Sequence, residues 1–144
     1  MSNRFETVEE REAFLAEPRL AMLIYNGARP GPTGVPVWFD WDGEVVRMFA
    51  DRGTPKMDHL TNDPNVSVLV TNHIGEREGW VAFDGAVSIG EFDPGEWVQL
   101  IERMGSRYWD MNNEAHAKTI AAWKEAPDAM ASLELRPDRI RSGA

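Results

Sequence analysis

The chain has 144 residues, of which 42% are hydrophobic, and a formal net charge of −9. This length suits a single domain spanning residues 1–144 with an apolar core, and the negative charge disfavours nucleic acid and anionic membranes as partners. The absence of cysteine excludes disulfides, thiolate metal sites and cysteine nucleophiles. Since the N-terminal residues are polar and no apolar run approaches the length of a membrane span, we expect a cytoplasmic protein.

The first fifty residues predict one helix and three strands. Thr7–Glu17 has a threonine at its start and a glutamate three residues later, which predicts a capped helix. Leu20–Tyr25 is a short apolar run that favours a buried strand, and a loop rich in glycine and proline follows it. Val35–Trp41 alternates with a period of two, and Asp42-Gly43 predicts a hairpin turn into a returning strand, Glu44–Ala50.

The middle of the chain predicts a short helix between strands. The helix covers Lys56–Asn62, and the next strand covers Val66–Thr71. Trp80–Glu91 predicts a longer strand with a bulge or a sharp bend at Gly85.

The last third of the chain has a helical pattern. Apolar residues at helical spacing predict helices over Pro94–Tyr108 and Ala115–Glu125, and Ala131–Arg136 alternates as a final strand with Leu133 and Leu135 pointing inward. Six strands joined by short connections favour an antiparallel barrel over a parallel α/β sheet.

The start of the short helix, Thr54-Pro55-Lys56, combines a hydroxyl, a helix N-terminus and a lysine, which suits an anionic group such as a phosphate. A cation at a helix N-terminus opposes the helix dipole, and a bound anion would relieve this conflict. The simpler alternatives are that Thr54 only caps the helix and that Lys56 is a solvated surface residue. Arg52 fits a ligand contact and a solvent-exposed position equally well.

The segment VRMFADRGTPKMDHLTNDPNVSVLV, residues 46–70, resembles the flavin-binding core of the pyridoxamine 5′-phosphate oxidase-like split β-barrel superfamily. The shared pattern is a strand, a turn ending in Ser or Thr and Lys, a short helix ending in Leu, and Asn-x-Pro-x-Val before the next strand. The resemblance implies a mainly β fold, namely a six-stranded antiparallel split β-barrel with peripheral helices and a C-terminal helical insert, Pro94 to Glu125, before the last strand. It also implies a homodimer with two flavin-type cofactors at the subunit interface.

The resemblance implies a set of cofactor-binding residues from the second strand, the third strand and the turn after it: Val37, Trp38, Phe39, Ala50, Asp51, Arg52, Thr54 and Lys56. The first three would line the flavin ring, Ala50 and Asp51 would approach the ring or the ribityl chain, and Thr54 and Lys56 would hold the phosphate. Pro55 stands where members of the family carry an arginine before the lysine, and Arg52 is the candidate to replace that guanidinium.

The function that these observations imply is that of an oxidoreductase which uses FMN, or alternatively F420, to transfer hydride to or from a small organic substrate. A non-catalytic flavin- or haem-binding storage protein on the same barrel is the alternative, and a cofactor-free interaction module is a third. The sequence assigns no residue a catalytic role, although Tyr108 and His73 are candidates for an acid or a base. The three histidines have no metal-ligand spacing, so we expect no metal site.

Aromatic residues support the expected homodimer. Trp38 lies on the strand face opposite Val37 and Phe39, and the remaining tryptophans add to an aromatic surface larger than a small barrel buries. We therefore expect Trp38 to lie at a dimer interface that also forms a wall for the cofactor. Arg107, Tyr108 and Trp109 are expected to pack at the end of their helix rather than to reach a neighbouring subunit.

Overall fold

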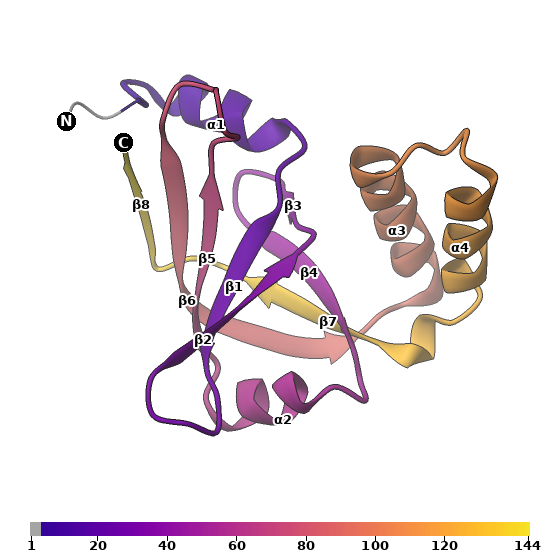
Figure 1. Ribbon diagram of the computed structural model, residues 1–144. Helices are drawn as coiled ribbons and strands as arrows, with labels where there is room; N and C mark the ends of the chain where they lie inside the picture. The colour runs from indigo at the N-terminus through magenta and orange to yellow at the C-terminus, as the bar shows by residue number, and fades with distance from the viewer. Residues whose placement is uncertain (1–3) are drawn as a thin grey trace.

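The fold is built around a curled antiparallel sheet, seen in the computed structural model, which describes residues 4–144. The sheet has eight strands in the order β2-β1-β5-β6-β7-β4-β3, and β8 pairs with β6 (Figure 1). The strands are β1 Ala21–Asn26, β2 Pro32–Val37, β3 Asp40–Trp41, β4 Val46–Asp51, β5 Asn65–Thr71, β6 Trp80–Glu91, β7 Met130–Leu135 and β8 Arg139–Gly143. The helices are α1 Val8–Ala16, α2 Pro55–Asn62, α3 Pro94–Tyr108, α4 Glu114–Lys124 and the short 3-10 turn η1 Pro127–Ala129.

The mainly β, antiparallel split barrel is confirmed, but the predicted count of six strands is wrong. The predicted strand Val35–Trp41 is two strands, since β2 pairs with β1 up to Val37 and the chain then crosses to pair with β4 as β3. Residues 32–34, expected in a loop, extend β2 at its start. The C-terminal β8 was not predicted.

The barrel is split between β2 and β4. β2 pairs with β1, whereas β4 pairs with β7 along its length and with β3 at Val46 and Arg47. No ladder joins β2 to β4 within residues 4–144, so the edges of these two strands face each other across the split.

Gly85 marks the point at which β6 changes partners. The first half of β6 pairs with β5 and β8, and its second half, from Val87, pairs with β7. A Cβ atom at Gly85 would lie 3.0 Å from a side-chain carbon of Leu135 and 3.3 Å from the carbonyl oxygen of Arg136. The glycine therefore permits the close approach of the end of β7 and of the connection between β7 and β8, while the pairing with β5 runs through Gly85 without a bulge.

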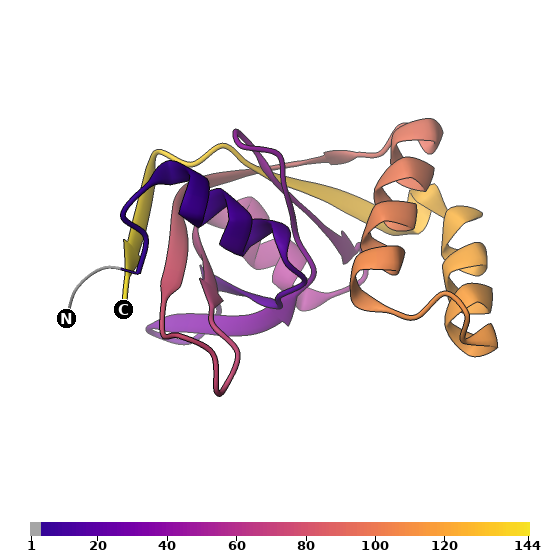
Figure 2. The ribbon, with the colours of Figure 1, turned by 90° about the horizontal axis from the view of Figure 1, so that it is seen from above.

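The barrel encloses the main core, and the helices surround it. The fully buried side chains of the barrel include Leu23, Phe39, Met48, Val68, Phe83, Leu133 and Leu135, which confirms the inward direction of the last two. α1 lies across one end of the barrel, α2 lies at the other end, and α3 and α4 stand together against its side (Figures 1 and 2). Thr7 and Glu10 form the predicted capping box of α1. No helix within residues 4–144 is long and apolar enough to cross a membrane.

Candidate functional site

A groove with a volume of about 470 Å³ lies at the split of the barrel. The end of β2 forms one wall, the outward face of β4 forms the floor, and α4 and the start of α2 close the two ends. The lining residues are Leu20, Pro36, Val37, Trp38, Phe49, Ala50, Asp51, Thr54, Lys56, Trp123 and Met130. Six of the eight cofactor-binding residues expected from the sequence therefore line one groove, namely Val37, Trp38, Ala50, Asp51, Thr54 and Lys56.

One end of the groove is polar because β4 ends there and α2 begins. Thr54 occupies the N-cap position of α2, but its hydroxyl donates a hydrogen bond of 2.8 Å to the carbonyl oxygen of Asp51 and does not cap the helix. The alternative that Thr54 only caps α2 through its hydroxyl is therefore wrong. The Asp51 carboxylate accepts a hydrogen bond of 2.8 Å from the amide of Gly53, which shapes the turn. The oxygen of Thr54 keeps the capacity to accept a further hydrogen bond.

Lys56 is a half-buried cation without a partner. Its ammonium group makes no hydrogen bond and no ion pair with any residue in 4–144, although it lines the groove. Burial lowers the pKa of Lys56, because the charged amine loses water and gains no compensating contact. A bound anion would supply that missing contact.

The other end of the groove is aromatic. An aromatic cluster packs between β4 and the two side helices and consists of Trp38, Phe49, Trp97, Tyr108, Trp109 and Trp123. The Trp38 ring stacks on Tyr108 with centroids 5.0 Å apart and planes at 10°, and Trp109 meets it edge-on at 4.9 Å. Trp38, Phe49 and Trp123 of this cluster supply flat apolar walls at the end of the groove away from Lys56, and the other members pack behind them.

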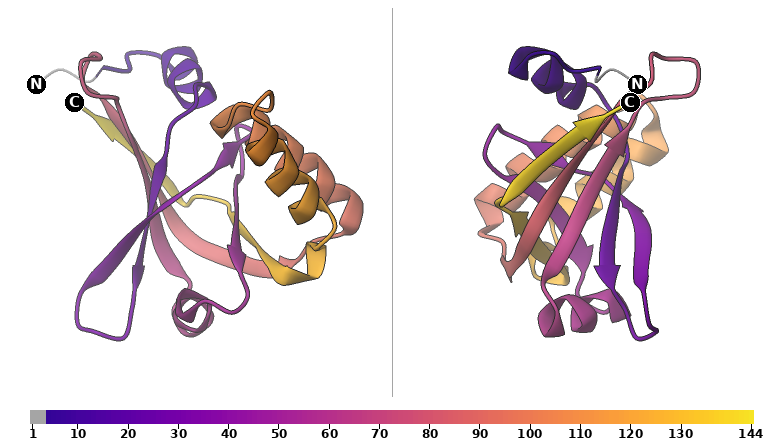
Figure 3. Two further views of the ribbon diagram at one scale, coloured as in Figure 1. Left: turned by 45° about the vertical axis from the view of Figure 1, so that its right-hand side comes forward. Right: turned by 90° about the vertical axis from the view of Figure 1, so that its left-hand side faces the viewer.

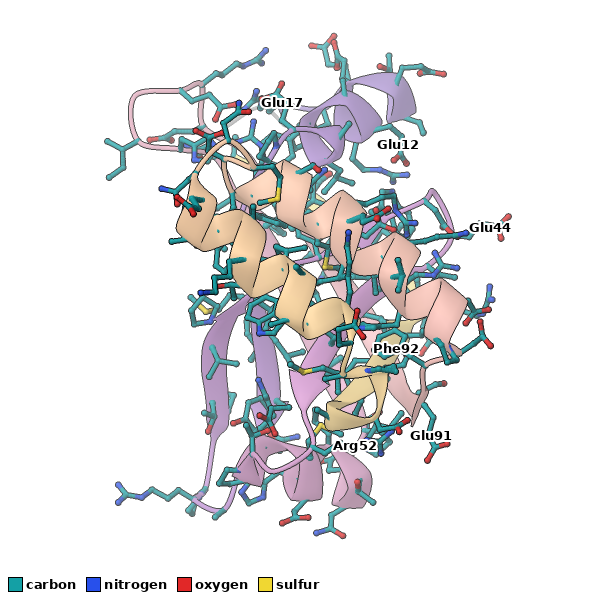
Figure 4. The ribbon with its side chains drawn as sticks, turned by 90° about the vertical axis from the view of Figure 1, so that its right-hand side faces the viewer. Glu12, Glu17, Glu44, Arg52, Glu91 and Phe92 are labelled. Atoms are coloured by element: carbon teal, nitrogen blue, oxygen red, sulfur yellow. The ribbon has the colours of Figure 1, made fainter. Side chains whose placement is uncertain are left out.

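Two of the expected cofactor-binding side chains do not line the groove. Phe39 is fully buried in the barrel core, and its backbone amide donates a hydrogen bond of 3.1 Å to the hydroxyl of Tyr108. The Nε of Arg52 donates to the carbonyl oxygen of Asp128 at 2.9 Å, and another guanidinium nitrogen lies 3.9 Å from a carboxylate oxygen of Glu91. Arg52 thus ties the end of β4 to the turn before β7, below the side helices (Figure 4).

The candidate acids and bases lie outside the groove. The Tyr108 hydroxyl donates to the carbonyl oxygen of Arg19 at 2.7 Å and accepts from Phe39, so backbone contacts already occupy it. His73 lies in the loop between β5 and β6, with its Nε2 atom 3.2 Å from the carbonyl oxygen of Pro18. Residues 4–144 contain no group of three or more histidines and carboxylates that could hold a metal ion.

The helical insert packs on its own barrel. Arg107 donates hydrogen bonds of 2.7–2.9 Å to the carbonyl oxygens of Leu15, Ala16 and Glu17, where α1 ends. These contacts agree with the packing at the helix end that the sequence predicts for Arg107. Trp38 packs against Tyr108, Trp109 and Trp123 of the same chain and also lines the groove, and its place at a dimer interface stays a prediction.

Sequence reasoning missed several lining residues. Phe49 could have been found, because it alternates with Asp51 on the outward face of β4. Trp123 and Met130 gave no such signal, since only the packing of α4 and the register of β7 against β4 bring them to the groove.

Comparison with known proteins identifies relatives of this chain. Residues 7–142 match the model of the pyridoxamine 5′-phosphate oxidase family. A search of curated proteins found no match.

Similar solved structures include proteins that differ in function. An F420 reductase has a TM-score of 0.70 and 21% identity over 90% of this chain and 94% of that chain. The haem storage protein HutZ of Vibrio cholerae has a TM-score of 0.72 and 19% identity over 96% of each chain. A FAD-binding protein of Mesorhizobium loti has a TM-score of 0.63 and 20% identity over 94% of this chain and 91% of that chain. At these identities the likeness establishes the fold.

Proposed function

Because the chain belongs to the pyridoxamine 5′-phosphate oxidase family, we propose that its groove binds a flavin-type cofactor, FMN or alternatively F420, and that the protein is an oxidoreductase. Thr54 and Lys56 hold the phosphate of the cofactor, and the ring lies toward the aromatic end near Val37 and Trp38. Similar proteins that are named as an F420 reductase and a FAD-binding protein support a flavin as the ligand class.

The observation that carries this proposal is the unpaired Lys56 in a groove with an aromatic opposite end. A half-buried ammonium group without a partner is unfavourable for the empty protein, and a phosphate removes that cost by forming charge-assisted hydrogen bonds. A planar ring attached to an anionic chain matches both ends of the groove. The volume of about 470 Å³ falls within the usual range for sites of this kind.

A bound flavin supplies hydride transfer, and the residues of the chain bind and orient it. Lys56 and Thr54 would anchor the anionic end, and Phe49 and Ala50 would line the floor beside the ring. The aromatic walls exclude water from the ring, which protects a reduced cofactor and strengthens hydrogen bonds to it. A small organic substrate approaches from the open side of the groove.

Haem storage is the second candidate function, since a haem storage protein has a similar structure. The groove lining contains no histidine, and Met130 is its one side chain of a type that commonly ligates haem iron. The anion-binding site at Lys56 and the aromatic walls therefore favour a flavin.

The absorption spectrum of the purified protein tests the proposal, together with mass spectrometry of any small molecule that heat releases. We expect a flavin or deazaflavin spectrum, or its appearance when FMN or F420 is added in a titration. A preparation that stays colourless and binds neither ligand would contradict the proposal, and a Soret band would favour haem.

A further inference from the structure

Trp123 is the single residue that the two side helices contribute to the lining of the groove. It lies on α4, and contacts with residues outside the groove and with Phe49 hold it in position. Its backbone carbonyl accepts a hydrogen bond of 2.6 Å from the indole nitrogen of Trp97, which is fully buried. Its ring lies 5.4 Å from that of Trp109 and 6.2 Å from that of Phe49. Trp123 is thus held in place before any ligand binds.

Trp123 and Trp38 are neighbouring walls of the aromatic end, with ring centroids 6.0 Å apart and planes at 58°. The indole N–H groups of Trp41 and Trp97 are paired, with Glu12 and with Trp123 respectively. The N–H groups of Trp38 and Trp123 have no hydrogen-bond partner within residues 4–144, and neither is fully buried. The aromatic end therefore offers both ring surface and unused donors, a combination that suits a polar heteroaromatic ring.

We propose that Trp123 is a specificity-determining residue that contacts the ring of the bound ligand and makes the groove select planar heteroaromatic ring systems. This inference rests on the proposed flavin site and adds to it, because ring recognition at Trp123 is separate from charge recognition at Lys56. A ligand that has the ring but no phosphate should keep the part of the binding free energy that comes from Trp123 and lose the part that comes from Lys56.

The test is a titration of FMN and of riboflavin, which carries the same ring without the phosphate, into the unmodified protein and two variants. Trp123→Leu is expected to weaken both ligands by the same factor, about three- to tenfold, as for the loss of an aromatic contact. Lys56→Met is expected to weaken FMN and to leave riboflavin unchanged. Quenching of flavin fluorescence measures both affinities without any assay of activity.

Trp109→Leu is the matched control, because Trp109 contacts both Trp38 and Trp123 but does not line the groove. Its affinity for both ligands is expected to stay near that of the unmodified protein. Trp123→Phe serves as a milder variant that keeps the cluster filled, with an expected loss of about two- to threefold for both ligands. Circular dichroism verifies that each variant is folded.

Two results would overturn the inference. One is riboflavin binding that Trp123→Leu and Trp123→Phe leave unchanged. The other is an equal loss in Trp109→Leu, which would assign the effect to loosening of the cluster. If the unmodified protein bound none of FMN, riboflavin and F420, the flavin site itself would be refuted, and that outcome is distinct from the other two.

Discussion

The charge of Lys56 has no partner among residues 4–144, and we expect it to stabilise a ligand complex at the expense of the empty protein. Its pKa is lowered by burial, so the unfolded chain binds the proton more tightly than the folded chain does. The stability of the empty protein therefore rises with pH between the folded and the unfolded pKa of this lysine. We predict that Lys56→Met raises the melting temperature of the empty protein and weakens FMN binding by about 1.5–3 kcal/mol, or roughly tenfold to a hundredfold.

Calorimetry and an FMN titration of the same variant measure the two effects of Lys56→Met. Lys118→Met, at an exposed lysine of α4, is the control and should change neither quantity. FMN affinity of the unmodified protein should fall as the pH rises through the lowered pKa of Lys56, because the neutral amine no longer pairs with the phosphate. Unchanged FMN affinity in Lys56→Met would remove this residue from the phosphate site.

Pro55 limits the number of positive charges at the proposed phosphate site. It is the first residue of α2, where proline fits well because the position needs no backbone N–H. Arg52, the candidate replacement for the missing arginine, is held by Asp128 outside the groove. We predict that Pro55→Arg tightens FMN binding by about 1–2 kcal/mol, and parallel titrations with FMN and F420 measure it. Tight FMN binding that the substitution leaves unaffected would show that the phosphate site is already complete.

At the scale of single residues, the polar end of the groove could be predicted from residues that are close together in the sequence. Thr54 and Lys56 could be recognised because a turn followed by a helix N-terminus is encoded within a few residues. The direction of the Thr54 hydroxyl could not be predicted, since the carbonyl of Asp51 competes with the helix amides for it. Arg52 was equally ambiguous, because its acceptor, Asp128, is far away in the sequence.

At the scale of elements, Arg19 joins α1 to the loop between β5 and β6. Its side chain is fully buried, with the guanidinium 3.8 Å above the Phe14 ring and bonded to both carboxylate oxygens of Glu76 at 2.6 and 2.7 Å. We predict that Arg19→Met lowers the free energy of unfolding by about 3 kcal/mol, because Glu76 then keeps only Arg4 of its two arginine partners and the loop loses its buried anchor. Urea denaturation measures the change.

The control for Arg19→Met is an exposed ion pair. Arg103 pairs with Asp40 at 3.1 Å, and its side chain is 52% exposed, so Arg103→Met should cost less than about 1 kcal/mol. Equal losses in the two variants would show that burial does not set the strength of the Arg19 contact.

The pairing of β6 with β8 depends on an acidic residue. Asp84 on β6 accepts hydrogen bonds from Arg139 and Arg141 of β8 and from Ser67 of β5. The Arg141 guanidinium is the main cause that holds the pKa of Asp84 well below its usual range. Stability from this depressed pKa is present above the unfolded pKa of about 4 and is lost as the pH falls through the folded value.

We predict that Asp84→Asn lowers stability at neutral pH and makes stability less sensitive to acid. Melting temperatures between about pH 7 and pH 2 measure this. As the pH falls, the unmodified protein should lose the stability that ionised Asp84 contributes, and the variant has no such contribution to lose. Asp58→Asn, at an exposed carboxylate of α2 that forms no ion pair within residues 4–144, is the control. Parallel pH profiles for Asp84→Asn and the unmodified protein would contradict the role of Asp84.

Helices and hairpins were predictable at this scale, and the pairing of distant strands was not. The capping box at Thr7 and the Asp42-Gly43 turn act within a few residues, and Gly43 has the positive φ of 98° that favours glycine. β8 has no clear alternation, and it is a strand because the free edge of β6 pairs with it. The crossing from β2 to β3 also depends on a partner, β4, that follows later in the chain.

At the scale of the whole molecule, one face of the sheet remains uncovered. The outward face of β1, β5 and β6 carries no helix (Figure 3, right), and its apolar residues include Met22, Ile24, Leu69 and Trp80. Leu20, which is 56% exposed, lies at the rim of the groove next to this face. An apolar surface of this kind is typical of an interface. We therefore propose this face as a homodimer interface, and the place of Trp38 at an interface stays a prediction.

We propose that a second copy on this face also covers the open side of the groove at Leu20 and contributes to the proposed cofactor site. We predict a dimer that buries more than ~2,000 Å² in total, as obligate dimers do.

Leu69 lies opposite Met22 and Ala82 in the sheet, so Leu69→Asp places a charge in the middle of the face and should give a monomer with weaker FMN binding. Val8→Asp, at a residue of α1 that is 58% exposed, is the control and should remain a dimer. Light scattering measures both variants, and an unmodified protein that is monomeric at micromolar concentration would refute the dimer.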